Sequence, residues 1–106
     1  MGYRIAEAGN HEARRKPVGS DIAPRVLRFN QFDSQPDQEG FEHDERESRQ
    51  EEVYVVLRGR GVLRVDGDEV PLEAGRYVLV EPESTRQVVA GPHGLSYVVF
   101  GARLEE

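Results

Sequence analysis

The sequence predicts an all-β protein, and residues 53–100 carry that prediction. Apolar runs of four to six residues alternate with polar positions, as Leu63 and Val65 do with Arg64 and Asp66, which places the two sets on opposite faces of a strand. Turns rich in Gly, Pro and Asp separate these runs about every seven to ten residues. No stretch with helical periodicity competes in this half of the chain. Short strands at this spacing are typical of an antiparallel sandwich or barrel.

Residues 1–24 are expected to form an N-terminal arm, because Ala, Gly, Pro and charged residues occur there without a sustained period. Gly9 and Asn10 interrupt a short helix that could otherwise form over 6–15. The barrel is expected over residues 25–106, with its first strand over 25–32. Residues 33–52 hold nine carboxylates and the breakers Pro36 and Gly40, so they predict a long loop of the kind that is often functional or disordered.

The other strands are predicted over 53–58, 62–66, 69–72, 77–80, 86–90 and 95–100. Glycine, proline and aspartate favour turn conformations. Turns are therefore predicted over 59–61, 66–68, 73–75, 81–84 and 91–94.

Length and charge restrict the class of protein. A chain of 106 residues forms one domain with a single core. Its net charge of −6 argues against binding to nucleic acid or to an anionic membrane surface, since both need a surplus of Lys and Arg. No apolar run approaches the roughly 18–20 residues of a membrane span, and the absence of cysteine excludes disulfides and thiolate metal sites. We therefore expect a cytoplasmic protein.

Two stretches resemble the motifs of the cupin superfamily. In the first, Glu52 is followed by six residues and Gly59, and the upstream text Glu42-His43-Asp44-Glu45 is similar to the Glu-His-Asp-His of one cupin subgroup, with Glu45 in the second histidine position. The second stretch, residues 75–86, places Arg86 at the motif's histidine position. The resemblance covers about residues 26–101. It implies a cupin-type double-stranded β-helix, a jelly-roll-like barrel, and a homodimer.

The resemblance also implies a divalent metal held by three histidines and one glutamate inside the barrel. The equivalent residues here are His43, Glu45, Glu52 and Arg86. Arg86 has no lone pair to offer a metal, which leaves one imidazole and two carboxylates. Such a set could hold Fe, Mn, Ni or Zn, although it would face a fixed positive charge.

Arg86 also supports an interpretation without a metal. A guanidinium inside a barrel needs a partner, which could be Glu52, Glu45 or the carboxylate or phosphate of a bound ligand. Tyr54 lies two residues after Glu52, on the same face of the strand. It either lines the same cavity or serves as a core tyrosine with a satisfied hydroxyl.

Three functional hypotheses follow from these residues. The first is a cupin that binds a small molecule, with an anionic group if Arg86 is free, through Glu52, Tyr54 and Arg86 and without the three-histidine metal site. Its apolar pocket residues are predicted to include Val56, Leu63 and Val88. The second is a metal-dependent dioxygenase or isomerase with His43, Glu45 and Glu52 as ligands. The third is a sensory or assembly module that pairs with another protein. The remaining histidines, His11 and His93, are expected to be solvated.

Overall fold

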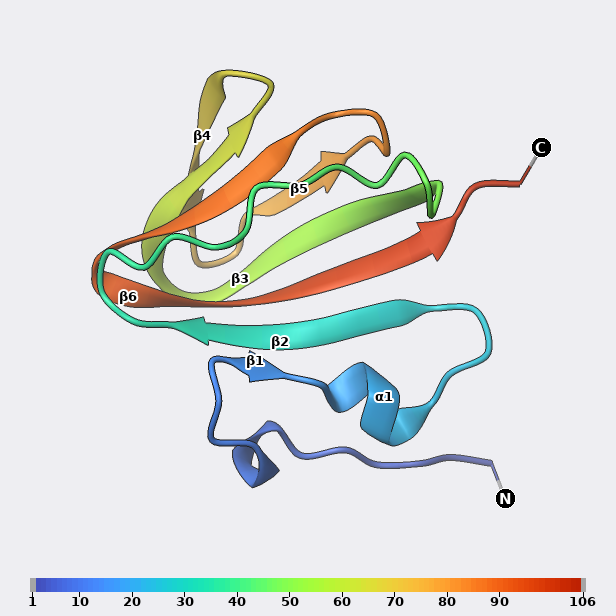
Figure 1. Ribbon diagram of the computed structural model, residues 1–106. Helices are drawn as coiled ribbons and strands as arrows, with labels where there is room; N and C mark the ends of the chain where they lie inside the picture. Colours follow the sequence, from blue (N-terminus) through green and yellow to red (C-terminus); the bar gives the residue numbers. More distant parts are fainter. Residues whose placement is uncertain (1, 106) are drawn as a thin grey trace.

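The computed structural model describes residues 2–105, in which five strands form the body of the protein (Figure 1). These strands are β2 (Arg28–Ser34), β3 (Gln50–Val65), β4 (Asp68–Glu73), β5 (Tyr77–Val80) and β6 (Arg86–Arg103). Three short elements precede them: the 3-10 helix η1 (Ala8–Asn10), strand β1 (Arg15–Lys16) and helix α1 (Val18–Ile22). The predicted all-β fold class is confirmed.

The strands are hydrogen-bonded in the order β1-β2-β6-β3-β4, and β5 pairs with the first half of β3. All pairings are antiparallel. The two longest strands, β3 and β6, pair from Gln50–Arg103 at one end to Val65–Arg86 at the other. Figure 1 shows that both strands curve, so that their two halves lie in different layers of the barrel. The layers are thus joined by continuous strands.

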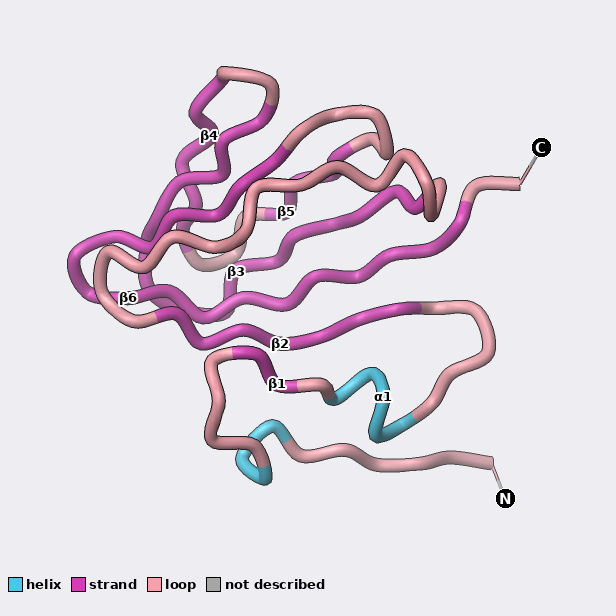
Figure 2. The backbone as a smooth tube through the Cα atoms, viewed as in Figure 1, coloured by secondary structure: helices cyan, strands magenta, loops and turns pink. Residues whose placement is uncertain are grey.

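The segments 59–61 and 91–94, predicted as turns, do not end strands but lie within β3 and β6 (Figure 2). The pairing of the two strands is nevertheless interrupted there, because Gly59 pairs with Leu95 and Gly61 with Ala90, which leaves residues 91–94 opposite Arg60 alone. The pairing of β3 with β6 shifts register around Gly59, and such bulges bend a strand without ending it. Gly59 has a φ of 85°, and a Cβ there would lie 2.4 Å from the carbonyl oxygen of Gly94. Glycine at position 59 therefore permits β3 to bend in close contact with the backbone of β6 at Gly94.

The strand predicted over 25–32 begins three residues later and ends two residues later, at Arg28–Ser34. Val26 and Leu27 precede it and remain 70% and 51% exposed, so their apolar character does not reflect burial in a strand. The strand predicted over 77–80 is confirmed as β5, and that over 69–72 is one residue longer at each end as β4.

The N-terminal segment lies against β2. Strand β1 pairs Arg15 with Phe32 and Lys16 with Gln31. The Lys16 Nζ donates hydrogen bonds to the carbonyl oxygens of His11 and Ala13 at 2.6 and 3.1 Å. The expectation that His11 is solvated is wrong, because its Nε2 lies 2.5 Å from the Asp21 Oδ2 and only a quarter of its side chain is exposed.

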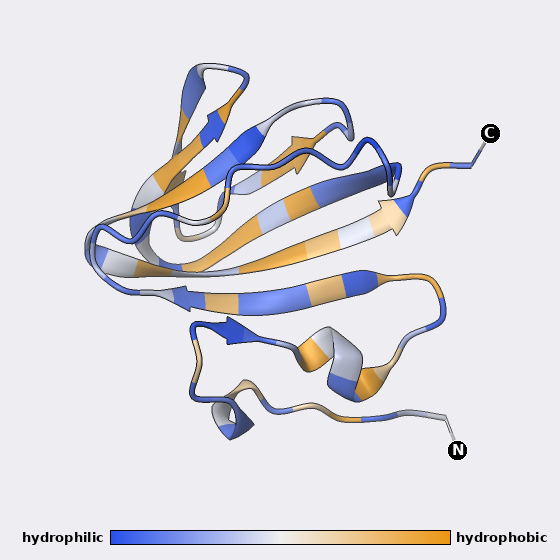
Figure 3. Ribbon diagram, in the orientation of Figure 1, coloured by the Kyte–Doolittle hydropathy of each residue, from blue (hydrophilic) through white to orange (hydrophobic). Residues whose placement is uncertain are grey.

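The core lies between the layers and draws on every strand from β3 to β6. Apolar and polar residues alternate along these strands (Figure 3), as expected when one face of each strand is buried. Among the described residues, no helix is long and apolar enough to cross a membrane. The buried hydrophobic residues are Tyr54, Val56, Leu63, Leu72, Val80, Val88, Ala90, Leu95 and Tyr97.

Candidate functional site

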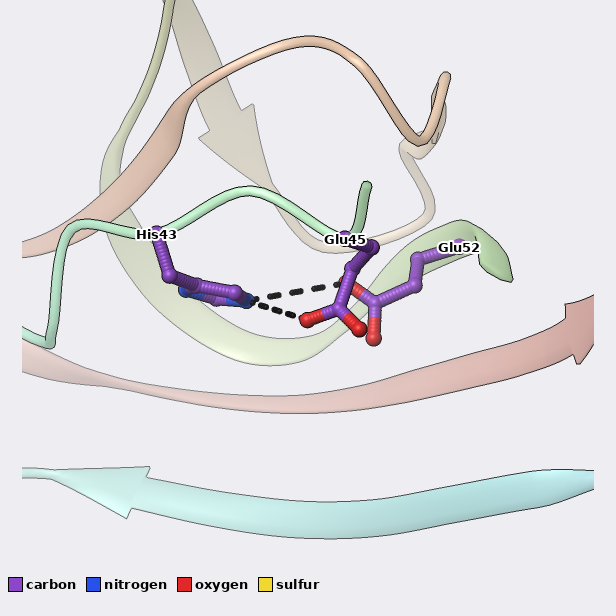
Figure 4. Close-up of side chains that lie close together, drawn as sticks. All are labelled: His43, Glu45 and Glu52. Atoms are coloured by element: carbon purple, nitrogen blue, oxygen red, sulfur yellow. Dashed lines mark ion pairs between the residues drawn. The ribbon is translucent and has the colours of Figure 1, made fainter. Parts of the chain in front are cut away.

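The side chains of His43, Glu45 and Glu52 converge between the loop before β3 and β3 itself (Figure 4). His43 Nε2 lies 3.0 Å from Glu45 Oε2 and 4.0 Å from Glu52 Oε1. The three possible ligand atoms all lie within 4.8 Å of one another. His43 and Glu45 come from the loop before β3, and Glu52 comes from β3 itself. Residues up to nine positions apart in the sequence thus meet at one point.

The loop that carries His43 is fixed to the barrel by its backbone. The His43 N–H donates to the Arg86 carbonyl at 3.0 Å, and the Arg86 N–H donates to the His43 carbonyl at 2.8 Å. The Glu45 N–H donates to the Pro82 carbonyl at 2.9 Å. These backbone hydrogen bonds hold the His43 imidazole and the Glu45 carboxylate beside Glu52, although both residues lie in a loop.

Arg86 lies inside the barrel and contacts Glu52. Its side chain has no exposed surface, and its Nη1 donates to Glu52 Oε1 at 3.3 Å. Its Nη2 donates to the Glu81 carbonyl at 2.7 Å, while its Nε has no hydrogen-bond partner among the described residues. The Tyr54 hydroxyl donates to the same Glu52 oxygen at 3.2 Å. Glu52 therefore shares one oxygen between a guanidinium and a phenol.

Burial raises the pKa of Glu52 above its ordinary value, and the neighbouring charge of Glu45 raises it further. Arg86, His43 and the Tyr54 hydroxyl favour the ionised form and oppose this rise. Burial also raises the pKa of Tyr54, and the charge of Glu52 adds to that effect. The phenol consequently stays protonated and acts as a donor to the carboxylate.

A cavity of about 290 Å³ opens beside these residues. Charged side chains, amides and aromatic rings share its lining. The charged ones are Arg14, Arg28, Arg86, His43, Glu45 and Glu52, the amides are Asn30, Gln50 and Gln87, and the rings are Phe29, Phe32, Phe41, Tyr54 and Tyr97. A mixed lining of this kind suits a ligand that is held by stacking and oriented by a few polar contacts.

The structure brings together all five residues singled out for the site: His43, Glu45, Glu52, Tyr54 and Arg86 line one cavity. Tyr54 is at the same time a core residue, 3% exposed, so the two interpretations of this side chain are compatible.

Of the predicted apolar pocket residues, only Val88 lines the cavity; Val56 and Leu63 lie in the core cluster instead. In the register, Val56 pairs with Tyr97 and Leu63 with Val88, so both lie next to residues that line the cavity without lining it themselves. Alternation along the strand therefore predicted correctly that Val56 and Leu63 face inward, but they face the core and not the cavity.

The sequence analysis did not identify three further residues that line the cavity, Arg14, Arg28 and Asn30. Arg28 and Asn30 share an inward strand face with Phe32, so period-two alternation along β2 could have found them. Arg14 lies before β1 and has no such signal, because only the pairing of β1 with β2 brings it to the cavity.

The comparisons with known proteins agree with this architecture. A protein-family model for the cupin domain matches residues 32–94, more than half of the chain. The chain belongs to the cupin family. The match includes His43, Glu45, Glu52, Tyr54 and Arg86, so the candidate site of this cupin lies within the shared domain.

Solved structures show the same fold at low sequence identity. A cupin protein from Bacteroides fragilis has a TM-score of 0.84 and 20% identity, covering 100% of this chain and 91% of its own. A Cupin 2 conserved barrel domain protein from Salinispora arenicola has a TM-score of 0.65 and 23% identity, with 74% and 64% covered. A predicted oxalate decarboxylase from Thermotoga maritima has a TM-score of 0.69 and 20% identity, with 81% and 74% covered. No curated protein matches this cupin.

Proposed function

We propose that this cupin binds a small polar molecule in its cavity without the usual three-histidine metal site. The observation that carries the proposal is the contact between Arg86 and Glu52, whose Nη1 and Oε1 lie 3.3 Å apart within the cavity lining. The guanidinium cannot ligate a metal and repels a cation from the carboxylate it contacts. Glu52 is thereby committed to hydrogen bonding, which suits recognition of an organic ligand.

The size and lining of the cavity support the same proposal. Ligand pockets usually measure about 300–1,000 Å³, so a cavity of about 290 Å³ suits a molecule at the small end of that range. Glu52 would accept hydrogen bonds from it, and the Tyr54 hydroxyl, whose proton is donated to Glu52, could accept one. Arg86 adds positive charge and an Nε donor that has no partner among the described residues.

A metal-dependent dioxygenase or isomerase is the second candidate, favoured by the convergence of three ligand atoms within 4.8 Å. His43, Glu45 and Glu52 fit Fe, Mn, Ni or Zn by donor type. When bound, such an ion would polarise a carbonyl or activate O2. The residues of this chain would then position the site: Tyr54 would orient Glu52 through its hydroxyl, and Arg86 would reduce the affinity for the cation by charge repulsion.

Metal titration separates the two candidates. We expect Fe²⁺, Mn²⁺, Ni²⁺ and Zn²⁺ to leave the free energy of unfolding unchanged, because the proposed site holds no ion. An ion bound at 100 times its Kd would instead add about 2.7 kcal/mol. The measurement is chemical denaturation with and without each ion, together with the metal content of the purified protein.

The control is a matched pair of histidine variants, His43→Ala at the site and His93→Ala on the exposed part of β6. Stoichiometric binding of an ion that is lost in His43→Ala and kept in His93→Ala would overturn the metal-free proposal in favour of the second candidate.

We also propose that this cupin is a cytoplasmic homodimer that associates through the outer face of its sheet. Val53 pairs with Leu79 on one side and Phe100 on the other, and the latter two remain 53% and 40% exposed. We expect Leu79→Glu to shift the mass in sedimentation equilibrium from dimer to monomer.

The control is Leu27→Glu, which alters an equally exposed leucine, 51%, outside the strands. This variant should remain dimeric. A monomeric wild-type protein would contradict the proposal.

A further inference from the structure

Two arginines from the N-terminal part of the chain, Arg14 and Arg28, also line the cavity. Arg14 lies in the N-terminal segment, and its guanidinium carbon is 5.2 Å from the centroid of the Phe32 ring. Phe32 in turn stacks on Tyr97, with ring centroids 5.1 Å apart. Arg28 lies on the inward face of β2. Both arginines reach the cavity from elements that had no assigned role in the site.

The backbone around Arg14 is ordered by several contacts. The Asp33 N–H donates to the Arg14 carbonyl at 2.9 Å, and the next residue, Arg15, pairs with Phe32 in the sheet. Lys16 Nζ ties the preceding turn together through the carbonyls of His11 and Ala13. The guanidinium is therefore presented from a fixed backbone, which lowers the entropic cost of using it to hold a ligand.

Neither arginine has a carboxylate partner. Among residues 2–105, Arg14 forms no ion pair, and Arg28 donates only to the backbone carbonyls of Pro24, Val26 and Leu27, at 3.2–3.5 Å. Most other arginines on the strands of this barrel do have one: Arg58, Arg60, Arg64 and Arg86 each contact an Asp or Glu. Arg14 instead contacts the Phe32 ring and the Tyr97 hydroxyl. In a chain with 20 acidic residues against 14 basic ones, two arginines without a carboxylate partner in one cavity lining suit an anion from outside.

The charges of the lining indicate how much negative charge the ligand carries. Three arginines face two glutamates there, so the arginines and glutamates of the lining together have a net charge of +1. A net charge of +1 fits one carboxylate. A phosphate carries close to two negative charges at neutral pH and would be repelled by Glu45 and Glu52 in the same cavity. The planar guanidinium of Arg14 also matches a carboxylate through two parallel hydrogen bonds.

We propose that the ligand is a small monocarboxylic acid whose carboxylate is bound by Arg14, with Arg28 beside it, so that the N-terminal segment forms part of the binding site. This inference rests on the proposed function. Arg28 and Glu52 both pair with Gly101 in the sheet, so one strand separates them, and the Gln50 amide oxygen and the Glu52 side chain lie over the glycine. The ligand lies in the cavity that these residues share, with its acid at the arginines and a hydroxyl or other donor at the glutamates.

The test uses the full-length, ¹⁵N-labelled protein and three pairs of probes: benzoate, 4-hydroxybenzoate and hexanoate, each with its neutral carboxamide. The side-chain amides of Asn30, Gln50 and Gln87 line the cavity and report binding by their chemical shifts. We expect at least one acid to bind about 10-fold or more tightly than its amide, the size of effect that one charge-assisted hydrogen bond supplies.

Arg14→Gln should abolish that preference, and Arg14→Lys should keep part of it because the charge remains while the planar fork is lost. The matched control is Arg60→Gln, which removes the same charge from a side chain 80% exposed and paired with Glu73; it should leave the affinities unchanged. The amide spectrum of each variant establishes that it is folded, and Arg14→Lys carries the test if Arg14→Gln does not fold.

Two results would contradict different statements. If the amides bind as tightly as the acids, or if the preference survives in Arg14→Gln, the carboxylate assignment is wrong and the proposed function stands. If no probe of either kind shifts the cavity resonances, the proposed function fails together with the inference.

Discussion

Replacing Arg86 with methionine is expected to lower the free energy of unfolding at pH 7 by about 3–5 kcal/mol, the usual loss when one partner of a buried ion pair is removed. Methionine fills much of the same volume, so the loss arises mainly from the carboxylate. Glu52, with a side chain only 14% exposed, would lose the guanidinium that favours its ionised form. Denaturant titration followed by tyrosine fluorescence measures the change.

A second substitution identifies the cause of that loss. In the Arg86→Met background, Glu52→Gln removes the unpaired charge, and we expect the double variant to be more stable than Arg86→Met alone. The coupling energy from this double-mutant cycle is compared with that of Arg64 and Glu69, an exposed pair at 3.4 Å for which about 0–1 kcal/mol is expected. Equal coupling energies for the two pairs would show that burial of Arg86 does not strengthen its interaction with Glu52.

The effect of Arg86→Met also depends on pH, with a sign set by Glu52. Its pKa in the folded protein is raised above the ordinary 4.5 by burial and by Glu45, so the protonated form favours folding; this contribution is present below pH 4.5 and is lost as pH rises through the folded pKa. Removing Arg86 takes away a group that lowers this pKa. The deficit of Arg86→Met relative to wild type should therefore shrink as the pH falls from 7 toward 4.5, and a constant deficit would contradict the role of Glu52.

Replacing Gly59 with alanine is expected to cost about 2–5 kcal/mol. A left-handed backbone costs a non-glycine residue about 1–2 kcal/mol, and overpacking adds about 1–3 kcal/mol. The φ of Gly59 is 85°, and its new Cβ would lie 2.4 Å from the Gly94 carbonyl oxygen and 3.0 Å from the Leu95 Cα. Because the contact is with backbone, no side chain can rotate away to relieve it.

Gly67→Ala is the matched control for this prediction. Gly67 has a similar φ, 91°, but nothing lies within 4 Å of its added Cβ, so only the backbone cost of about 1–2 kcal/mol is expected. Denaturant titration of both variants isolates the contact at the bend of β3 and β6. Similar losses in the two variants would show that close approach at Gly59 contributes little.

The strands and part of the site could be predicted because their signals are local. Alternation along a strand requires only neighbouring residues, and it placed Glu52 and Tyr54 on one inward face. The cupin motif selected His43, Glu45 and Arg86 by spacing. The partner of Arg86 remained open, since Glu52, Glu45 and a ligand anion satisfy a guanidinium equally well in a linear sequence. Glu52 contacts it because β3 pairs Glu52 with Val80 at the end of β5, and the Arg86 guanidinium lies there, donating to the carbonyl of the next residue, Glu81.

The sequence by itself therefore determined the all-β class and which residues face inward, because a strand alternates its faces whatever its neighbours are. It could not distinguish a glycine that ends a strand from one that bends it: Gly59 and Gly94 favour turns locally, and only the pairing of β3 with β6 makes them bends. Tertiary structure likewise decided that Arg14 reaches the cavity, since β1 must first pair with β2. Glu52, which the sequence offered as a metal ligand or as a partner of Arg86, contacts Arg86 in the folded protein.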